Sequence, residues 1–289
     1  MGGFEPDPAL TYDRVLDGIA AAGFTGTELG DCGFMPDNPV KLRSELVARG
    51  LEMIGAFTPV RLTDGDAHGE SEAAAVRAAR LLKASSESPA RRPGPFVILA
   101  EASTRERLAV AGRVGEGHAL TLSQWGALAR GAERIAKRVR DEAGLSTVFH
   151  HHCGTPVETL DETVRFMEMT DPGLVGLCYD SGHFAYAGTD PLEALKRFGD
   201  RTWHVHFKDF RAGIRERARR EGWDYHRAVA GGLFCELGAG DIDFPRLMGH
   251  LQSIAYSGWI VIEDEIPPGS GDPFENAKRD RAYLRRLGL

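Results

Sequence analysis

Short apolar runs alternate with longer amphipathic segments along the chain. Most of these apolar runs are continuous, which is typical of parallel strands that are buried on both faces. The pattern predicts seven strands, at residues 25–30, 51–57, 95–102, 146–152, 174–182, 202–209 and 258–265. Because amphipathic segments separate the strands, the pattern indicates βαβ units and a parallel sheet.

Three of the intervening segments carry apolar residues at helical spacing. Residues 12–23 end in a glycine, and residues 122–144 begin next to Ser123, which we expect to cap the helix. Residues 156–169 begin with Pro156, a residue suited to the first helical position. We therefore predict helices in all three segments.

The remaining connections are polar. Residues 84–95 are rich in proline and polar side chains and predict a flexible surface loop, and residues 113–121 are also loop-like. Residues 211–232 predict an inserted helix plus a loop between the last two strands. The stretch GAGDIDF, at residues 238–244, neither follows a strand nor opens a helix with its glycines, so it is no dinucleotide fingerprint. We expect it to lead Phe244 into the next helix.

The fold class that fits this order is an α/β (β/α)₈ TIM barrel, formed as a single domain over residues 1–289. A closed barrel needs eight strands, and only seven are predicted. The missing one belongs before the helix at 12–23, where the chain is rich in glycine, proline and aspartate. We therefore expect a barrel that lacks its first strand, either through a truncated gene model or in a naturally clipped variant. A doubly wound open sheet is the alternative.

Composition narrows the classes of protein. The formal net charge of −7 favours neither a nucleic-acid nor an anionic-membrane partner. No apolar run is long enough to span a bilayer, and the N-terminus lacks the pattern of a secretory signal. The four cysteines form no CxxC pair, which indicates reduced thiols and a cytoplasmic protein. They are Cys32, Cys153, Cys178 and Cys235.

Four of the predicted strands end in ionisable residues. These residues are His150, His151 and His152; Asp180 and His183; His204, His206, Lys208 and Asp209; and Glu263, Asp264 and Glu265. Alternation places His150 and His152 on one face of their strand. In the same way His204, His206 and Lys208 share a face of their strand, and Glu263 and Glu265 share a face of theirs. Because the carboxyl ends of barrel strands meet at one face, these groups are expected to converge on a site for a divalent cation.

Each residue also has a structural interpretation. A single histidine at a strand end can be a hydrogen-bonded core residue, and Asp180 can be a helix cap or turn former. Glu263 is harder to explain in this way, since a carboxylate that ends a buried strand needs a partner. Glu28 and Glu101 end two other strands, where they either bind hydroxyl groups or face solvent.

Several motifs resemble those of the xylose-isomerase-like TIM-barrel family of sugar isomerases and epimerases. They are GFTGTELG, VFHHHCGTPVET, YDSGHFAYAGTDP, HVHFKD, GDIDF and YSGWIVIEDE, and the likeness extends from about residue 11 to 289. The HHHxGT stretch is the most specific of them. The others are common to the family and select no substrate.

The resemblance implies a divalent metal in the barrel mouth. Its ligands correspond to Asp180, His206 and Glu263, while the position of a further glutamate ligand falls on His150. Which of His150 and His152 is the ligand stays open. The implied cation is Mn²⁺ or Co²⁺, with Mg²⁺, Fe²⁺ or Zn²⁺ as alternatives. A histidine in place of the glutamate departs from epimerases that use two glutamates as their acid–base pair.

This departure favours a dehydratase that acts on a keto-polyol, such as 2-keto-myo-inositol, through an enediolate. Glu263 or His152 is then the base, and His183 or His152 the acid. Lys208 either adds positive charge near the enolate or forms a structural ion pair with Asp209 or another neighbour. The expected partner is a small polyol or sugar, with a homo-oligomer as a further expectation.

Other reactions of the same barrel stay open. They are ketose 3-epimerisation, aldose–ketose isomerisation, 3-dehydroshikimate dehydration and metal-dependent C-glycoside cleavage. A non-catalytic sugar-binding protein is the alternative from a different class.

Overall fold

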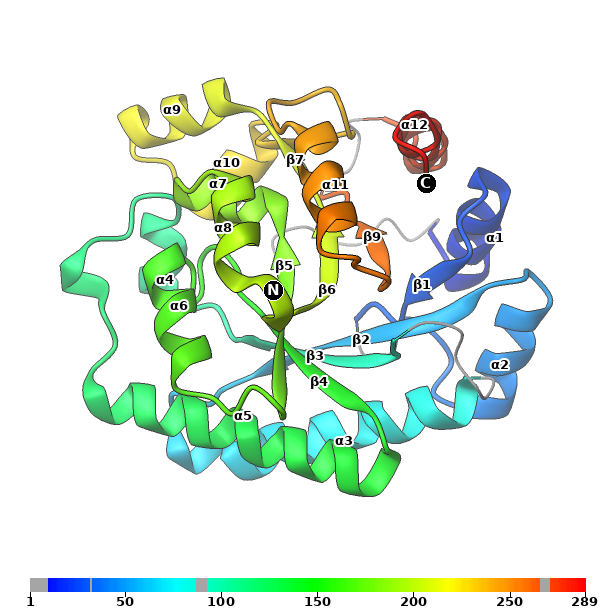
Figure 1. The fold of residues 1–289 in the computed structure, drawn as a ribbon, viewed down its shortest axis with the longest axis horizontal. Coiled ribbons are helices and arrows are strands. Elements are labelled where there is room, and N and C mark those ends of the chain that lie inside the picture. Colours follow the sequence, from blue (N-terminus) through cyan, green and yellow to red (C-terminus); the bar gives the residue numbers. More distant parts are fainter. Residues whose placement is uncertain (1–9, 32, 87–92, 266–270) are drawn as a thin grey trace.

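The computed structural model describes residues 10–31, 33–86, 93–265 and 271–289. Seven parallel strands form one sheet in the order β1-β2-β3-β4-β5-β6-β9, wrapped by helices (Figure 1). The strands are β1 (Gly26–Glu28), β2 (Glu52–Val60), β3 (Phe96–Glu101), β4 (Ser146–His150), β5 (Val175–Asp180), β6 (Thr202–Phe207) and β9 (Ile260–Ile262). All seven predicted strands are present. Every residue of β3 and of β5 is buried, as their continuous apolar runs predict.

Most helices cover the outside of the sheet, and α7 lies at the carboxyl ends of the strands. These helices are α1 (Tyr12–Ala22), α2 (Pro39–Val47), α3 (His68–Ser85), α4 (Arg105–Val110), α5 (Leu122–Ala143), α6 (Leu160–Glu168), α7 (Ser181–Ala187), α8 (Pro191–Phe198), α11 (Phe244–Ser253) and α12 (Pro273–Arg286). Short 3₁₀ turns lie at Gly65–Ala67, Glu116–His118 and Gly199–Arg201. Figure 1 shows α3 and α5 side by side along one edge of the molecule, where they pack together.

Local capping explains where two helices begin. The expected cap Ser123 is wrong, because Thr121 caps α5 in a reciprocal capping box with Gln124. The helix expected from Pro156 begins instead at Leu160, where Thr159 and Glu162 form a second capping box. The predicted helix at 12–23 and the helix that starts at Phe244 are confirmed.

A seam separates the first and last strands of the sheet. Among the described residues, neither β1 nor β9 pairs with another strand on its outer edge. A cavity of about 890 Å³ lies there, with Phe24, Ile54 and Trp259 among its lining residues. Helices α1 and α12 pack against each other beside it. The region of the expected first strand, residues 1–9, lies outside the described part of the chain.

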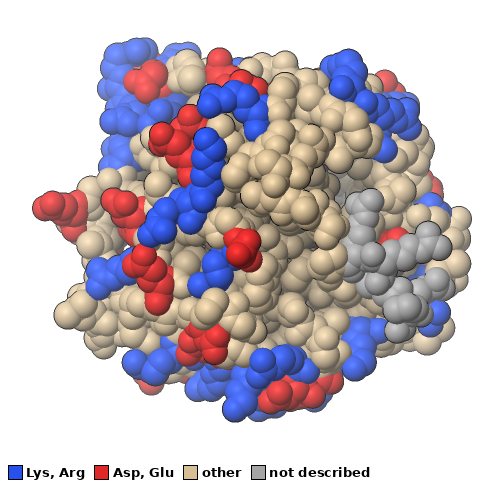
Figure 2. Space-filling view, in the orientation of Figure 1, with Lys and Arg blue, Asp and Glu red and all other residues tan. Residues whose placement is uncertain are grey.

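The insertion at 211–232 contains two helices, α9 (Ala212–Glu221) and α10 (Tyr225–Ala230), so the prediction of one helix plus a loop is wrong. A short antiparallel pair, β7 (Asp209–Phe210) with β8 (Phe234–Cys235), closes its base. Basic side chains gather over α9 in Figure 2, since four of its ten residues are arginine. Because the insertion follows the carboxyl end of β6 almost directly, it lies at the face of the sheet where the parallel strands end.

Part of the predicted loop at 84–95 lies outside the described residues, and α3 extends to Ser85. Residues 113–121 form a connection with one short 3₁₀ turn, in agreement with the loop prediction. Within the described ranges, no helix is both long and apolar enough to cross a membrane.

Candidate active site

Four side chains converge at the carboxyl ends of β4, β5, β6 and β9. They are His150, Asp180, His206 and Glu263, and we call them the four-residue cluster. Strand register places Asp180 opposite His206 in the β5–β6 pair, while His150 lies opposite Cys178, two residues before Asp180. The backbone N–H of Glu263 then bonds to the carbonyl oxygen of Phe207, just beyond the last pair of β6 and β9. All four are residues that the sequence proposes as metal ligands.

The spacing of these atoms suits a cation. Nε2 of His150 lies 3.8 Å from Oδ2 of Asp180 and 3.8 Å from Oε2 of Glu263. Nδ1 of His206 lies 3.9 Å from Asp180 Oδ2 and 2.8 Å from Glu263 Oε2. Ligands about 2.1 Å from one ion stand roughly 3.0–3.4 Å apart in octahedral or tetrahedral geometry. Small side-chain shifts would therefore bring all four donors around one ion.

The two oxygens of Asp180 have different environments. Oδ1 accepts the backbone N–H of His183 at 2.8 Å and so caps α7. Oδ2 is buried, faces the cluster and has no hydrogen-bond partner. The two interpretations of Asp180, helix cap and ligand, are therefore compatible. A buried carboxylate oxygen without a donor is unfavourable unless something positive fills the space beside it.

Five further side chains form a second group beside the first. His152, His183, Lys208, Glu265 and Tyr225 belong to it, and we call it the proton-transfer cluster. The imidazole rings of His152 and His183 have centroids 3.9 Å apart. The ammonium of Lys208 lies 3.1 Å from His183 Nε2 and 3.1 Å from Glu265 Oε2. Tyr225 donates its hydroxyl to Glu265 at 2.8 Å.

Lys208 joins the two clusters. Its side chain is fully buried, and its Nζ lies 3.0 Å from Oε1 of Glu263. Burial opposes its charge, but Glu263 and Glu265 hold the pKa of Lys208 above its usual value. The expected pair with Asp209 is not formed, because Asp209 accepts backbone N–H groups from the 238–242 loop instead. Of the two sequence interpretations, Lys208 has the ion pair with a neighbour and also lies where it would contact a ligand.

The two histidines of the proton-transfer cluster are neutral near pH 7. Burial, with the charges of His150 and Lys208, lowers the pKa of His152 to about 3. Burial and the same cationic neighbourhood hold the pKa of His183 well below its ordinary value. Nδ1 of His152 lies 2.7 Å from the Cys153 carbonyl oxygen. Because a carbonyl only accepts, Nδ1 carries the ring proton and Nε2 keeps a free lone pair.

The predicted alternation along the histidine run holds beyond the strand. β4 ends at His150, so His151 and His152 lie past the ladder. His151 still faces away from the site, stacked on Phe184 at a centroid distance of 3.6 Å. Its ring nitrogens have no hydrogen-bond partner. His151 is therefore a core residue, and His150 and His152 belong to separate clusters.

Glu28 and Glu101, whose roles the sequence leaves open, have different contacts. Oε1 of Glu28 lies 2.7 Å from His204 Nε2 and 3.0 Å from His206 Nε2. Although burial opposes its charge, these imidazoles hold the pKa of Glu28 well below the usual value. Glu101 accepts from the backbone of Leu62 and from Thr63, so it supports a loop. Neither glutamate simply faces solvent.

Tyr225 and Glu265 are site residues that sequence reasoning missed. Tyr225 lies 16 residues after Asp209, within the insertion, and α10 carries its ring to within 5.6 Å of the His152 ring. The available signal was weak: Asp224 precedes it and caps α10 through the N–H of Arg227. The sequence places Glu265 on the same face as Glu263 but assigns it no role.

Comparison with known proteins identifies the family of this chain. The family model described as "Xylose isomerase-like TIM barrel" matches residues 16–287. The chain belongs to this family. Among its relatives, an inosose dehydratase of Geobacillus kaustophilus is 35% identical over 96% of this chain and 87% of that protein. An inosose dehydratase of Lacticaseibacillus casei is 33% identical over 95% of this chain and 89% of that protein.

Solved structures of other proteins share the fold. An L-ribulose 3-epimerase superposes with a TM-score of 0.66 at 18% identity, covering 95% of this chain and 88% of the other. A probable 3-DHS dehydratase from Bacillus anthracis gives a TM-score of 0.68 at 12% identity, covering 96% of this chain and 94% of the other. At these identities the likeness concerns the barrel alone. It confirms the predicted fold class.

Proposed function

We propose that this protein is a metal-dependent dehydratase of a keto-polyol, with 2-keto-myo-inositol as the substrate to test. The observation that carries the proposal is that the four-residue cluster, which suits a metal ion, lies beside the proton-transfer cluster. Lys208 contacts both, through Glu263 and through His183. The inosose dehydratases that align with nearly the whole chain support this substrate.

The four-residue cluster would hold the cation through two imidazole nitrogens and two carboxylate oxygens. Such a mixed set suits Mn²⁺ or Co²⁺, and the unpartnered Oδ2 of Asp180 fits a bound cation. When bound, the ion supplies a Lewis acid that polarises a ketone oxygen and favours loss of a proton from the neighbouring carbon. The Glu263 side chain is 37% exposed, so it forms the open side of the cluster.

The proton-transfer cluster would provide the base and the acid. His152 keeps a free Nε2 lone pair and is neutral, so it removes the proton next to the ketone. His152 then gives that proton to the departing hydroxyl group, directly or through the neighbouring His183 ring, whose centroid lies 3.9 Å away. Water leaves, both histidines are neutral again, and the Lys208 ammonium stays charged beside His183 throughout. Glu263 is the alternative base.

The test is an NMR time course of 2-keto-myo-inositol with the metal-loaded protein in D₂O. Loss of water to give a diketone supports the proposal. Entry of deuterium next to the ketone without dehydration points instead to an isomerase or epimerase. No change in any substrate signal, with the metal confirmed in the protein, overturns the substrate assignment.

A further inference from the structure

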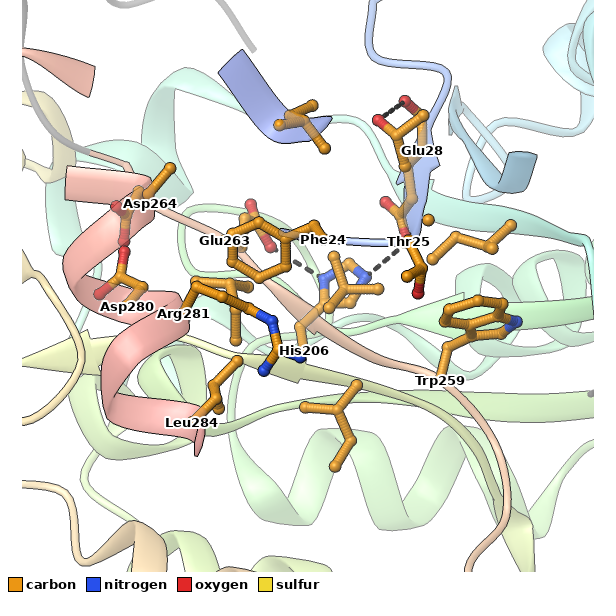
Figure 3. A pocket seen from close by; sticks show the side chains of 18 of the residues that line it. Phe24, Thr25, Glu28, His206, Trp259, Glu263, Asp264, Asp280, Arg281 and Leu284 are labelled. Carbon is orange, nitrogen blue, oxygen red and sulfur yellow. Dashed lines mark hydrogen bonds and ion pairs between the residues drawn. The ribbon is translucent and has the colours of Figure 1, made fainter. Parts of the chain in front are cut away.

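His206 has a different neighbour on each ring nitrogen. Its Nδ1 faces the four-residue cluster, 2.8 Å from Glu263. Its Nε2 faces the opposite way, 3.0 Å from Oε1 of Glu28. Figure 3 shows the His206 ring between these two carboxylates, with a dashed line to each. The ring therefore bridges strand β1, which carries Glu28, and the end of β9.

The position of the His206 proton follows from this arrangement. A nitrogen that binds a cation must offer its lone pair, and a neutral imidazole has only one nitrogen without a proton. If Nδ1 serves the cluster, then Nε2 carries the proton and donates it to Glu28. A carboxylate that accepts this proton fixes the tautomer and the orientation of the ring.

Glu28 is itself held by a second imidazole. Nε2 of His204 lies 2.7 Å from the same oxygen, Oε1, so one carboxylate oxygen faces two ring nitrogens. His204 and His206 are both buried, and the Glu28 side chain is 16% exposed. All three groups are thus fixed within the barrel.

We propose that Glu28 and His204 are positioning residues of the metal centre. Glu28 orients His206 and keeps its Nδ1 lone pair toward the four-residue cluster, and His204 holds Glu28 in place. This inference rests on the proposed function, since it assumes that the cluster binds a cation.

Two other interpretations of these contacts exist. Glu28, His204 and His206 are close enough to form a cation site of their own. However, one neutral His206 ring cannot offer lone pairs to both sites, and the unpartnered oxygen of Asp180 favours the four-residue cluster. In the other interpretation, the contacts only tie the edge strand β1 to β6 and stabilise the barrel.

The experiment is calorimetric titration of the metal-free full chain with Mn²⁺ alone, for the wild type and three variants. Glu28→Gln keeps an acceptor oxygen but loses the charge, and we expect Mn²⁺ affinity to fall about 10- to 100-fold. Glu28→Leu removes the acceptor and should bind more weakly still. Glu101→Gln is the matched control, because Glu101 is also a buried glutamate at a strand end but contacts only the 62–63 loop. Its Mn²⁺ affinity should be unchanged.

His204→Phe tests the inference if the Glu28 variants fold poorly. It keeps a ring in place and leaves Glu28 intact, and we expect a smaller loss of Mn²⁺ affinity with the stoichiometry still one ion per chain. The melting temperature of each metal-free variant is measured in parallel. An unchanged Mn²⁺ affinity together with a lower melting temperature would mean a structural tie only, and would overturn the inference.

The remaining outcomes also decide the question. Two Mn²⁺ ions per wild-type chain, one of which is lost in Glu28→Gln, would overturn the inference in favour of a second cation site. A wild type that binds no Mn²⁺ would overturn both the inference and the metal site of the proposed function. Weakened Mn²⁺ binding in the Glu28 variants, combined with a wild type that does not dehydrate the keto-polyol, would support the inference and overturn the substrate assignment.

Discussion

Asp180 permits a test that separates metal binding from folding. Its Oδ1 caps α7, whereas its Oδ2 faces the cluster without a partner. Asp180→Asn keeps the capping oxygen, and asparagine caps a helix about as well as aspartate. The substitution also replaces a buried carboxylate whose Oδ2 lacks a hydrogen-bond partner. We therefore expect the metal-free variant to melt at or slightly above the temperature of the metal-free wild type.

The effect of metal should differ sharply between the two proteins. A cation present at 100 times its dissociation constant stabilises the wild type by about 2.7 kcal/mol. At roughly 2–4 °C per kcal/mol, this raises the melting temperature by about 5–11 °C. If Asp180→Asn weakens affinity about 100-fold, the same concentration contributes only about 0.4 kcal/mol, a rise of about 1–2 °C.

Thermal unfolding followed by circular dichroism, with and without Mn²⁺, measures both quantities. Asp190→Asn is the control, since Asp190 caps α8 through the N–H of Leu192 and lies outside both clusters. The melting temperature of this control should rise with Mn²⁺ as much as that of the wild type. A shift in Asp180→Asn as large as that of the wild type would refute the assignment of Asp180 as a ligand.

Three further predictions concern the site and its support. His152→Ala should lower turnover about 10²–10⁴-fold, measured by steady-state kinetics, with Mn²⁺ affinity retained; unchanged turnover would remove His152 from the mechanism. Tyr225→Phe loses its bond to the charged Glu265 and should lower turnover about 10- to 100-fold, whereas wild-type kinetics would make the phenol hydroxyl dispensable. Burial raises the pKa of Glu158 to about 7. The folded state therefore holds a proton that the unfolded state loses above about pH 4.5, so stability should fall by about 3 kcal/mol between pH 4.5 and 7 and then level off. Urea unfolding at several pH values in this range measures the free energy of unfolding. That free energy should fall less steeply with pH in Glu158→Gln than in the wild type, and an equal fall in both would contradict the role of Glu158.

The strands could be predicted because burial on both faces leaves a strong pattern. Runs such as those of β3 and β5 contain almost no polar residue until their last position, so both the strand and its functional end were visible. The two capping boxes were less visible, because Ser123 and Pro156 are also residues that begin helices. Only the reciprocal bonds of Thr121 with Gln124 and of Thr159 with Glu162 decide between the candidates.

The contacts within the site were predictable only in part. Convergence of His150, Asp180, His206 and Glu263 follows from strand ends that share one face of a barrel. The role of Glu28 does not, because its partner His204 lies 176 residues away and β1 has only three residues. Tyr225 comes from an inserted helix, whose direction depends on packing that no periodicity encodes.

The seam beside β1 and β9 bears on the order of events during turnover. The cavity there is lined by Glu28, His206 and Glu263 as well as by apolar residues, so within the described chain it reaches the cluster from the flank of the barrel. His152 and Glu265 line the same cavity, so it reaches the proton-transfer cluster as well. Within the described residues, cation and substrate would then share this space, and a bound substrate would slow the exchange of the ion.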